Sequence, residues 1–263
     1  MQGIGNDYVY VNCFEEEVKD PAAMAVRVSD RHFGIGADGL ILICPSETCD
    51  VRMRMFNADG SEGKMCGNGA RCVAKYAYDH GICRKETFTL ETLGGVKTIK
   101  VFTENGKVKT AAVDMGKAVL TGPVPEPITV NGEEKEMIAV DVGNPHAVYY
   151  VPSKEALMGL DLENIGPGYE RHPRFPEGVN SEFIYAESPD LLWMRVWERG
   201  SGETLACGTG ATASAYASMV SGRCGNRVTV RLLGGDLVIE RTDDGRLIMT
   251  GPAEEVFTGE FPD

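Results

Sequence analysis

The chain has 263 residues, of which 43% are hydrophobic, and its 39 acidic and 26 basic residues give a net charge of −13. This length allows one large domain or two smaller ones. The basic residues are few and do not cluster, which argues against nucleic acid as a partner. No apolar run approaches the roughly 20 residues of a membrane span.

The N-terminal residues lack the basic and apolar regions of a secretory signal, so we expect a cytoplasmic protein. The eight cysteines include no Cys-x-x-Cys pair. Because a chain of this size with no export signal does not depend on disulfides, we expect reduced thiols, and we expect no structural zinc or other metal.

Strand-like segments open the first half of the chain and a helical stretch at 21–28 interrupts them. A Cys-Gly-x-Gly turn at 66–69 then begins a helix, which Gly81 ends. A strand pair with a double glycine between its members closes this half. The predicted elements are strands 7–11, 40–44 and 51–56, helix 67–80, and strands 87–92 and 96–102.

The second half repeats this order after a glycine- and proline-rich segment at 116–127, which we interpret as a linker. A second proline-rich stretch, 166–178, is expected to be a surface loop. The predicted elements are strands 147–151, 182–186 and 192–197, helix 208–221, and strands 227–232 and 237–241. We therefore expect domains at 1–118 and 119–250, with the tail 251–263 returning to the first.

One motif, Cys-Gly-x-Gly-Ala, occurs twice, at 66–70 and at 207–211. The offset of 141 residues also relates Met53-Arg54 to Met194-Arg195, and Gly81 and Cys83 to Gly222 and Cys224. An internal duplication accounts for all of these matches, and it predicts two similar domains that each offer one cysteine.

The helix in each half has no clear polar face. The second is small and apolar nearly all round, and a helix of this kind is buried. A buried helix among many strands predicts a mixed α/β (α+β) fold of two pseudo-symmetric domains. Each would be a curved sheet wrapped around a central helix, with the active site in the cleft between the domains.

Cys66 and Cys207 each stand at the start of such a helix, where free backbone N–H groups and the helix dipole favour negative charge. We expect this position to lower the pKa of each thiol toward neutrality. The N–H groups of the following glycines can bind a substrate carboxylate. Two opposed thiols can act on the two faces of one carbon, one by removing a proton as base and the other by donating a proton as acid. Either cysteine alone would be an ordinary core residue, and the repeated context favours catalysis.

One motif has a misleading form. Residues 34–39 match G-x-G-x-x-G, but a dinucleotide-binding loop follows a strand and precedes a helix. Here a helical stretch comes before the motif and a strand comes after it, so we interpret it as a tight turn. Nothing in the sequence marks a pyridoxal phosphate lysine, and no cofactor is expected.

The chain resembles the diaminopimelate epimerase family over nearly its whole length. The resemblance is carried by five segments in order: 5–7, 65–69, 143–146, 197–200 and 206–210. It implies a cofactor-independent isomerase of amino-acid biosynthesis that interconverts LL- and meso-diaminopimelate for lysine and peptidoglycan. It also implies two pseudo-symmetric domains and, by family analogy, a homodimer.

By the same resemblance, Cys66 and Cys207 are the acid–base pair, and His146 orients the site. The substrate carboxylate at the reacting centre would be held by Gly67, Asn68, Gly208 and Thr209. The rest of the substrate would be held by Asn6, Asn57, Asn144, Asn180, Glu198 and Arg199. Gly39 stands where some relatives carry a glutamine that contacts substrate.

Three alternatives remain open on the sequence. A racemase of the proline or hydroxyproline type would share the fold and both cysteines, but such relatives tend to have histidine where this chain has Asn68. A non-catalytic binding protein would have no need to retain both cysteines. A thiol redox protein could pair Cys66 with Cys207, and a reversible disulfide between them would inactivate the enzyme.

Overall fold

A computed structural model gives the structure of the protein and describes residues 1–262. The chain forms two compact units. Unit 1 comprises residues 1–113 and the C-terminal segment from Thr250 onward, and unit 2 comprises Asp114–Met249. Within 1–262, no helix is both long and apolar enough to cross a membrane.

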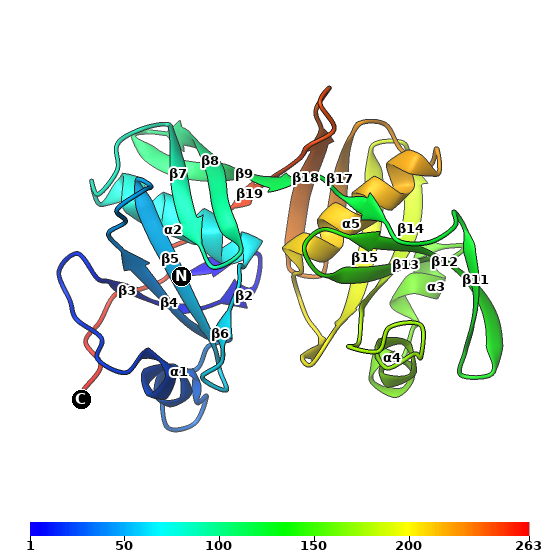
Figure 1. Ribbon diagram of the computed structural model, residues 1–263, viewed down its shortest axis with the longest axis horizontal. Helices are drawn as coiled ribbons and strands as arrows, with labels where there is room; N and C mark the ends of the chain where they lie inside the picture. The colour runs from blue at the N-terminus through cyan, green and yellow to red at the C-terminus, as the bar shows by residue number, and fades with distance from the viewer. Residues whose placement is uncertain (263) are drawn as a thin grey trace. The chain divides into compact units, whose positions relative to one another are not determined.

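Unit 1 is mostly sheet, with one short helix and one long one (Figure 1). Asp20 caps the short helix by accepting a hydrogen bond from Ala23 N at 3.0 Å. Its elements are β1 (Gln2–Gly3), β2 (Asn6–Asp7), β3 (Val9–Asn12), α1 (Pro21–Ser29), β4 (Gly39–Cys44), β5 (Val51–Asn57), β6 (Glu62–Gly63), α2 (Gly67–Asp79), β7 (Thr87–Thr92), β8 (Gly95–Glu104), most of β9 (Lys107–Gly116), and the end of β19 (Leu247–Pro252).

Unit 2 has the same character, with one long helix and two short ones, α3 (Lys154–Met158) and α4 (Leu162–Glu170). These helices pack over an aromatic cluster that includes Tyr149, Tyr169 and Phe183. Its elements are β10 (Val119–Leu120), β11 (Glu126–Val130), β12 (Glu133–Asp141), β13 (Pro145–Tyr150), α3 (Lys154–Met158), α4 (Leu162–Glu170), β14 (Asn180–Ser188), β15 (Leu191–Glu198), β16 (Gly202–Glu203), α5 (Gly208–Val220), β17 (Arg227–Leu232) and β18 (Gly235–Arg241).

Strand pairing repeats between the two units in both order and sense. The pairs β3–β4 and β13–β14 are parallel, and so are β5–β7 and β15–β17. The pairs β4–β5 and β14–β15 are antiparallel, as are β7–β8 and β17–β18. This repeated topology confirms the predicted mixed α/β fold and its duplication.

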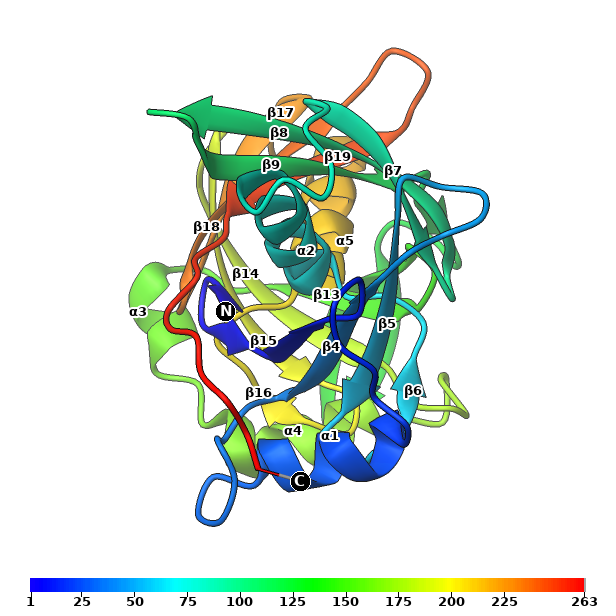
Figure 2. The same cartoon turned by 90° about the vertical axis from the view of Figure 1, so that its left-hand side faces the viewer.

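Each unit is built around one buried helix. Helix α2 packs against β1, β4, β5 and β8, and helix α5 packs against β12–β15, β17 and β18. Figure 2 shows α2 beneath the strands β7, β8 and β9. Every residue from Gly67 to Ala74 is buried, and α5 is buried from Gly210 to Ala215. The expected central helices are therefore present, and each ends before a glycine with positive φ, Gly81 or Gly222.

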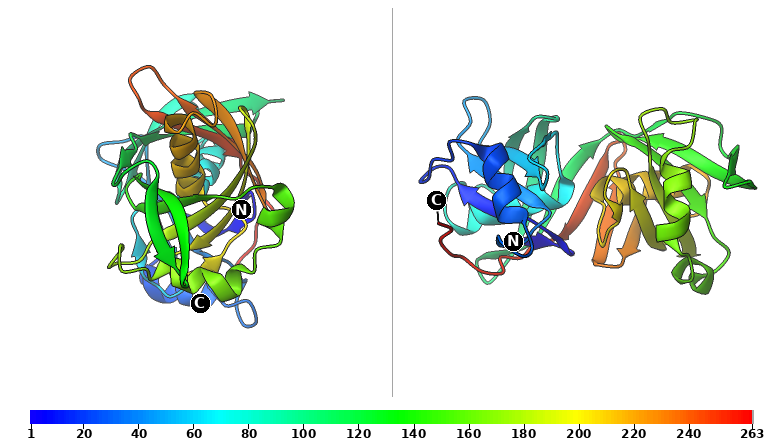
Figure 3. Two further views of the ribbon diagram at one scale, coloured as in Figure 1. Left: turned by 90° about the vertical axis from the view of Figure 1, so that its right-hand side faces the viewer. Right: turned by 90° about the horizontal axis from the view of Figure 1, so that it is seen from below.

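The N-terminal strand and the segment after β19 both belong to unit 1. They form an antiparallel bridge, in which Gln2 and Glu254 exchange two backbone hydrogen bonds of 2.9 Å each. Figure 3 shows the two segments side by side.

Some sequence predictions differ from the structure. The proposed loop at 166–178 is wrong at its start, because α4 continues to Glu170 through Gly166, Pro167 and Gly168. A Cβ on Gly166 would lie 2.2 Å from the Trp197 ring, so a close tertiary contact places glycine inside this helix. The proposed linker at 116–127 contains β10 and the start of β11. Strands β9, β12 and β19 were not predicted.

Candidate active site

Cys66 and Cys207 have the same local structure in the two units. Each is the N-cap of its helix, with extended backbone at φ −128° and −125° respectively. Each sulfur accepts a hydrogen bond of 3.3 Å from the third helical N–H, that of Gly69 or Gly210. The thiol therefore takes the place that a serine or aspartate oxygen usually occupies at a helix start.

Cys66 lies in unit 1 beside Asn6, and its sulfur donates to Asn6 Oδ1 at 3.3 Å. The other end of the Asn6 amide donates to Asp38 Oδ2 at 2.8 Å. Burial raises the pKa of Asp38, and the nearby Asp7 carboxylate raises it further. Asp38 thus fixes which end of the Asn6 amide faces the cysteine.

Two further residues predicted for this half-site, Gly67 and Asn68, form the first turn of α2 and are buried. Asn68 Oδ1 accepts a hydrogen bond of 2.9 Å from Arg71, whose side chain is buried one turn further along the helix. Arg71 also donates to the carbonyl of Pro252 at 3.0 Å. Arg71 therefore ties the start of α2 to the end of β19.

Asn57, at the end of β5, donates from its side chain to Ser61 Oγ at 2.9 Å. Gly39 has no room for a side chain, because a Cβ there would lie 2.1 Å from the carbonyl oxygen of Phe56. Gly34 is equally tight, at 2.1 Å from the carbonyl oxygen of Arg27. These contacts account for two glycines of the 34–39 motif, which follows α1 and ends at the first residue of β4.

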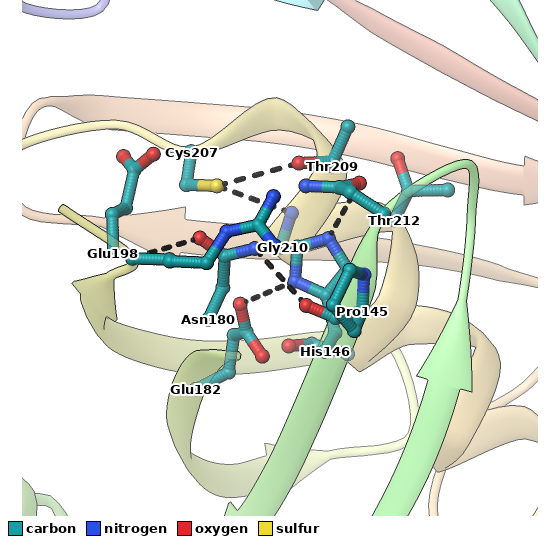
Figure 4. A network of polar contacts seen from close by, with 12 residues as sticks. Pro145, His146, Asn180, Glu182, Glu198, Cys207, Thr209, Gly210 and Thr212 are labelled. Carbon is teal, nitrogen blue, oxygen red and sulfur yellow. Dashed lines mark hydrogen bonds and ion pairs between the residues drawn. The ribbon is translucent and has the colours of Figure 1, made fainter. Parts of the chain in front are cut away.

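Cys207 lies in unit 2 among polar residues from three strands (Figure 4). Its sulfur is 3.6 Å from Thr209 Oγ1, and Gly208 and Thr209 form the first turn of α5. Glu198 contacts the sulfur from the end of β15 and also accepts a hydrogen bond from Thr204. A second carboxylate, Glu182 on β14, lies below the same helix turn, 2.7 Å from where a Cβ of Gly210 would be.

Burial raises the pKa of the Cys207 thiol well above its ordinary value, and the carboxylates of Glu198 and Glu182 raise it further. The expectation of a lowered pKa is therefore wrong for Cys207. Its cap hydrogen bond with Gly210 acts in the expected direction but is outweighed. Burial likewise raises the pKa of Glu198.

His146, on β13, is completely buried in the same unit. Its Nδ1 lies 2.7 Å from Glu182 Oε1, and its Nε2 lies 3.0 Å from Asn144 Oδ1. The ring thus joins a buried carboxylate to one of the asparagines predicted to bind substrate.

Asn180 and Arg199 form the remaining part of this half-site. The Asn180 amide donates to the Pro145 carbonyl and accepts from Arg199 N, both at 3.0 Å, so both of its ends hold the backbone. The Arg199 guanidinium donates to the Glu177 carbonyl at 3.1 Å. Asn180 therefore joins the start of β13 to the turn that follows Glu198.

The structure gathers the predicted residues into two groups, one within each unit. Asn6 and Asn68 lie around Cys66 in unit 1, while Asn144, His146, Asn180, Glu198 and Arg199 lie around Cys207 in unit 2. Sequence reasoning missed the supporting residues Asp38, Arg71, Glu182 and Thr204. The 141-residue offset aligns Glu182 with Ile41 in the sequence. The replacement of an apolar residue by an acidic one at this position was a signal that could have identified Glu182. Residues 1–262 contain no group of three or more histidine, cysteine or acidic residues able to hold a metal ion.

The folds of several solved structures are similar to this one. A phenazine biosynthesis protein of the PhzF family from Bacillus anthracis has a TM-score of 0.72 at 16% identity, with 96% of this chain and 92% of that chain covered. A hydroxyproline epimerase from Agrobacterium vitis has a TM-score of 0.68 at 15% identity, with 95% and 86% covered. At these identities the similarity concerns the fold alone.

Curated relatives are similar over almost the full length. The diaminopimelate epimerase of Acetivibrio thermocellus is 50% identical and covers 99% of this chain and 96% of its own. That of Desulfovibrio desulfuricans is 51% identical with the same coverage, and that of Methanococcus maripaludis C5 is 48% identical, covering 99% and 98%. The family model for diaminopimelate epimerase matches residues 1–121 and 138–256. The chain therefore belongs to the diaminopimelate epimerase family.

Proposed function

We propose that this isomerase epimerises LL-diaminopimelate to meso-diaminopimelate, with Cys66 and Cys207 as its two acid–base residues. The observation that carries the proposal is the repeated thiol cap: two cysteines, each bonded to the third N–H of a glycine-rich helix, occupy equivalent places in a duplicated fold. The identity of 48–51% to diaminopimelate epimerases supports the choice of substrate.

In the proposed reaction, one cysteine acts as a thiolate and removes the α-proton from one face of the substrate carbon. The opposite cysteine, as a thiol, delivers its proton to the other face. The carbon thereby inverts, and the two sulfurs exchange protonation states. The raised pKa of Cys207 favours its protonated form, which suits it to be the acid when Cys66 is the base.

Backbone N–H groups at Gly67, Asn68, Gly208 and Thr209 would bind the carboxylate of the reacting centre. They lie at the positive ends of two helices, so they also stabilise the charge that grows as the proton leaves. Asn6, Asn57, Asn144, Asn180, Glu198 and Arg199 would hold the distal amino and carboxylate groups. Arg199 matches a carboxylate and Glu198 an ammonium group, while His146 orients the site.

The second candidate is a racemase of the proline or hydroxyproline type, which the fold similarity to a hydroxyproline epimerase brings forward. A substrate with one carboxylate and no distal amino acid centre would offer no group for Glu198 and Arg199 to bind. We therefore place this candidate second.

Incorporation of deuterium at the α-carbon separates the two candidates. Reduced protein is incubated in D₂O with LL-diaminopimelate, L-proline or trans-4-hydroxy-L-proline, and NMR follows both exchange and stereoisomer. Exchange in diaminopimelate alone, with the meso isomer appearing, is the expected result. Exchange in proline or hydroxyproline alone would support the second candidate function. No exchange in any of the three substrates by the reduced protein would contradict both candidates.

A cytoplasmic location and a homodimer are part of the same proposal. All eight cysteines are free thiols, as is usual in a reducing compartment. Light scattering of the purified protein tests the homodimer, which a mass near the 28.5 kDa of one chain would contradict. Cell fractionation tests the location, and recovery of the protein outside the cytoplasmic fraction would contradict it.

A further inference from the structure

Glu182 is a fully buried carboxylate at a position where the fold does not require an acidic residue. It lies on β14, and its side chain has no exposure to solvent. Its Oε2 has no hydrogen-bond partner among residues 1–262. A buried carboxylate is unfavourable unless it is paired, so its presence calls for an explanation other than packing.

The duplication supplies a natural comparison, because Ile41 occupies the equivalent place in unit 1. Ile41 pairs with Met55 on the next strand and Glu182 pairs with Val196, so the offset of 141 holds on both strands. Ile41 Cδ1 lies 2.5 Å from a Cβ on Gly69, and Glu182 Oε1 lies 2.7 Å from a Cβ on Gly210. Both side chains fill the same space under a cysteine-capped helix, and an apolar one is sufficient for the fold.

Within residues 1–262, the side chain of Glu182 has one hydrogen-bond partner, His146. The two side chains are both 0% exposed, and Glu182 Oε1 lies 2.7 Å from Nδ1. An ionised carboxylate can only accept, so the ring donates from Nδ1. The other ring nitrogen, Nε2, lies 3.0 Å from Asn144 Oδ1, which also accepts, so Nε2 donates as well and the ring carries a proton on each nitrogen (Figure 4 shows the ring and Glu182).

We propose that Glu182 is a positioning residue that holds His146 with a proton on each ring nitrogen, one on Nδ1 toward Glu182 and one on Nε2 toward Asn144 Oδ1, and so fixes the orientation of the Asn144 side chain. The other groups that face this pair are Glu198 from β15 and Cys207 at the start of α5. Asn6, the equivalent of Asn144 in unit 1, has its amide fixed by a different carboxylate, Asp38. Each half-site therefore uses one acidic residue to orient one asparagine.

The consequence for substrate rests on the proposed function. An asparagine presents a donor at one end of its amide and an acceptor at the other, and a rotation by 180° exchanges them. With Oδ1 held by the His146 ring, the NH₂ group of Asn144 is the end left for a substrate carboxylate. Loss of Glu182 would leave a neutral ring, whose Nε2–H group is a weaker donor to Asn144 Oδ1, and would therefore weaken this orientation and the binding of substrate.

The first test is NMR of the imidazole groups in ¹⁵N-labelled protein without substrate. The chain has four histidines, and a His146→Gln sample assigns the signals of His146. In the wild type at pH 7, both ring nitrogens of His146 are expected to carry protons. In Glu182→Ile, the ring is expected to lose the Nδ1 proton and keep only the one on Nε2, the tautomer that histidine favours in water. A wild type with a proton on only one ring nitrogen, or an unchanged ring in Glu182→Ile, would overturn the proposal.

Glu182→Ile installs the residue of the equivalent site, and the unchanged signals of His32, His80 and His172 would show that it has folded. If it does not fold, Glu182→Gln takes its place. An amide oxygen is a weaker acceptor than a carboxylate, so the Nδ1 proton signal is expected to move upfield, and an unmoved signal would be equally decisive against the proposal. Glu203→Gln is the matched control, since it alters an acidic residue of unit 2 paired to Arg195 at 2.7 Å and is expected to leave the His146 signals in place.

Kinetics add a second measurement. The expected effect of Glu182→Ile is a rise in KM for diaminopimelate of about tenfold, with a smaller loss in kcat, because a binding contact is disordered. Glu182→Gln should recover part of this loss. Equal kinetics for the wild type and both variants would contradict the effect on substrate. The NMR result does not depend on activity, so a wild type that fails to epimerise diaminopimelate would refute the proposed function and leave the role of Glu182 to be decided by the spectra.

Discussion

The Cys66 sulfur lies 3.3 Å from Asn6 Oδ1, and Asp38 holds the opposite end of the same amide at 2.8 Å. A side chain that contacts the proposed base is thus fixed by the carboxylate of Asp38. Orientation of this kind is needed for catalysis because small displacements of reacting groups cost large factors in rate.

Asp38→Asn is expected to lower kcat, because an amide at position 38 can donate as well as accept and no longer selects one orientation of Asn6. The measurement is steady-state epimerisation of diaminopimelate. Asp20→Asn is the control, since Asp20 is exposed and caps α1 through Ala23 N, a role that asparagine fills equally well. Equal rates for Asp38→Asn and the wild type would show that Asn6 needs no such support.

Cys66→Ala and Cys207→Ala are each expected to reduce epimerisation by about 1,000-fold or more, since general acid–base groups typically contribute factors of this order. Serine at either position should retain only weak activity, because a hydroxyl is a far poorer base than a thiolate. Cys83→Ala serves as the comparison for a buried cysteine away from the two caps. Full turnover by either alanine variant would refute the two-base mechanism.

Glu198→Gln is expected to shift the alkylation profile of Cys207 to lower pH. The wild-type pKa of this thiol is raised by burial and then by Glu198, so removal of that charge lowers the pKa and gives more thiolate at any given pH. The rate of iodoacetamide modification at Cys207, measured by peptide mass spectrometry from pH 6 to 10, provides the profile. A midpoint that stays in place would mean that Glu198 does not raise the pKa of Cys207.

The protein should lose stability above about pH 9. Burial raises the pKa of Cys13 to about 12 and that of Cys224 to about 11, from an ordinary value of 9.0. The folded state therefore keeps both thiols protonated where the unfolded chain ionises. Their contribution is complete below pH 9 and declines as the pH rises toward these values. Urea unfolding from pH 8 to 10.5 measures the decline, and Cys224→Ala should make it shallower. A slope that this substitution leaves unchanged would contradict the assignment.

Gly39→Ala is expected to lower the free energy of unfolding by about 1–3 kcal/mol or more, because a methyl group would lie against the backbone of β5. The distance from this Cβ to the Phe56 carbonyl oxygen would be 2.1 Å. Gly259→Ala is the control, with no atom of the described residues 1–262 within 4 Å of the added carbon. Equal urea midpoints for the two variants would show that β4 and β5 can move apart at little cost.

Much of the fold could be predicted from local sequence. The hairpin strands and both long helices were placed within about two residues, because glycines end them and because their apolar residues repeat regularly. Strands β9 and β12 were missed, although Asn-Gly pairs typical of hairpin turns precede them at 105–106 and 131–132. Strand β12 begins with a charged run, Glu133 to Glu136, which does not show the alternation of a half-buried strand. Helix α4 could not be predicted from its glycines and proline, since its contact with Trp197 depends on the tertiary fold.

The candidate site was predictable to a different extent. The helix-capping position of both cysteines follows from the motif itself. The high pKa of Cys207 does not, because Glu182 and Glu198 come from strands that precede the motif by up to 25 residues and reach the sulfur only in the folded unit. The supporting role of Asp38 was likewise not predicted from the sequence, since Asp38 lies in a turn in which the glycines are the recognisable pattern.

The sulfur at each helix start is both the proposed proton carrier and the hydrogen-bond acceptor that caps the helix. This double role has a consequence for chemical inhibition. A reagent that alkylates Cys66 or Cys207 removes a proton carrier and also removes the acceptor for the N–H of Gly69 or Gly210. Inactivation and loosening of the helix therefore arise from one covalent event. Modified protein should melt at a lower temperature in proportion to the label it carries, so thermal denaturation would report engagement of these thiols without any substrate.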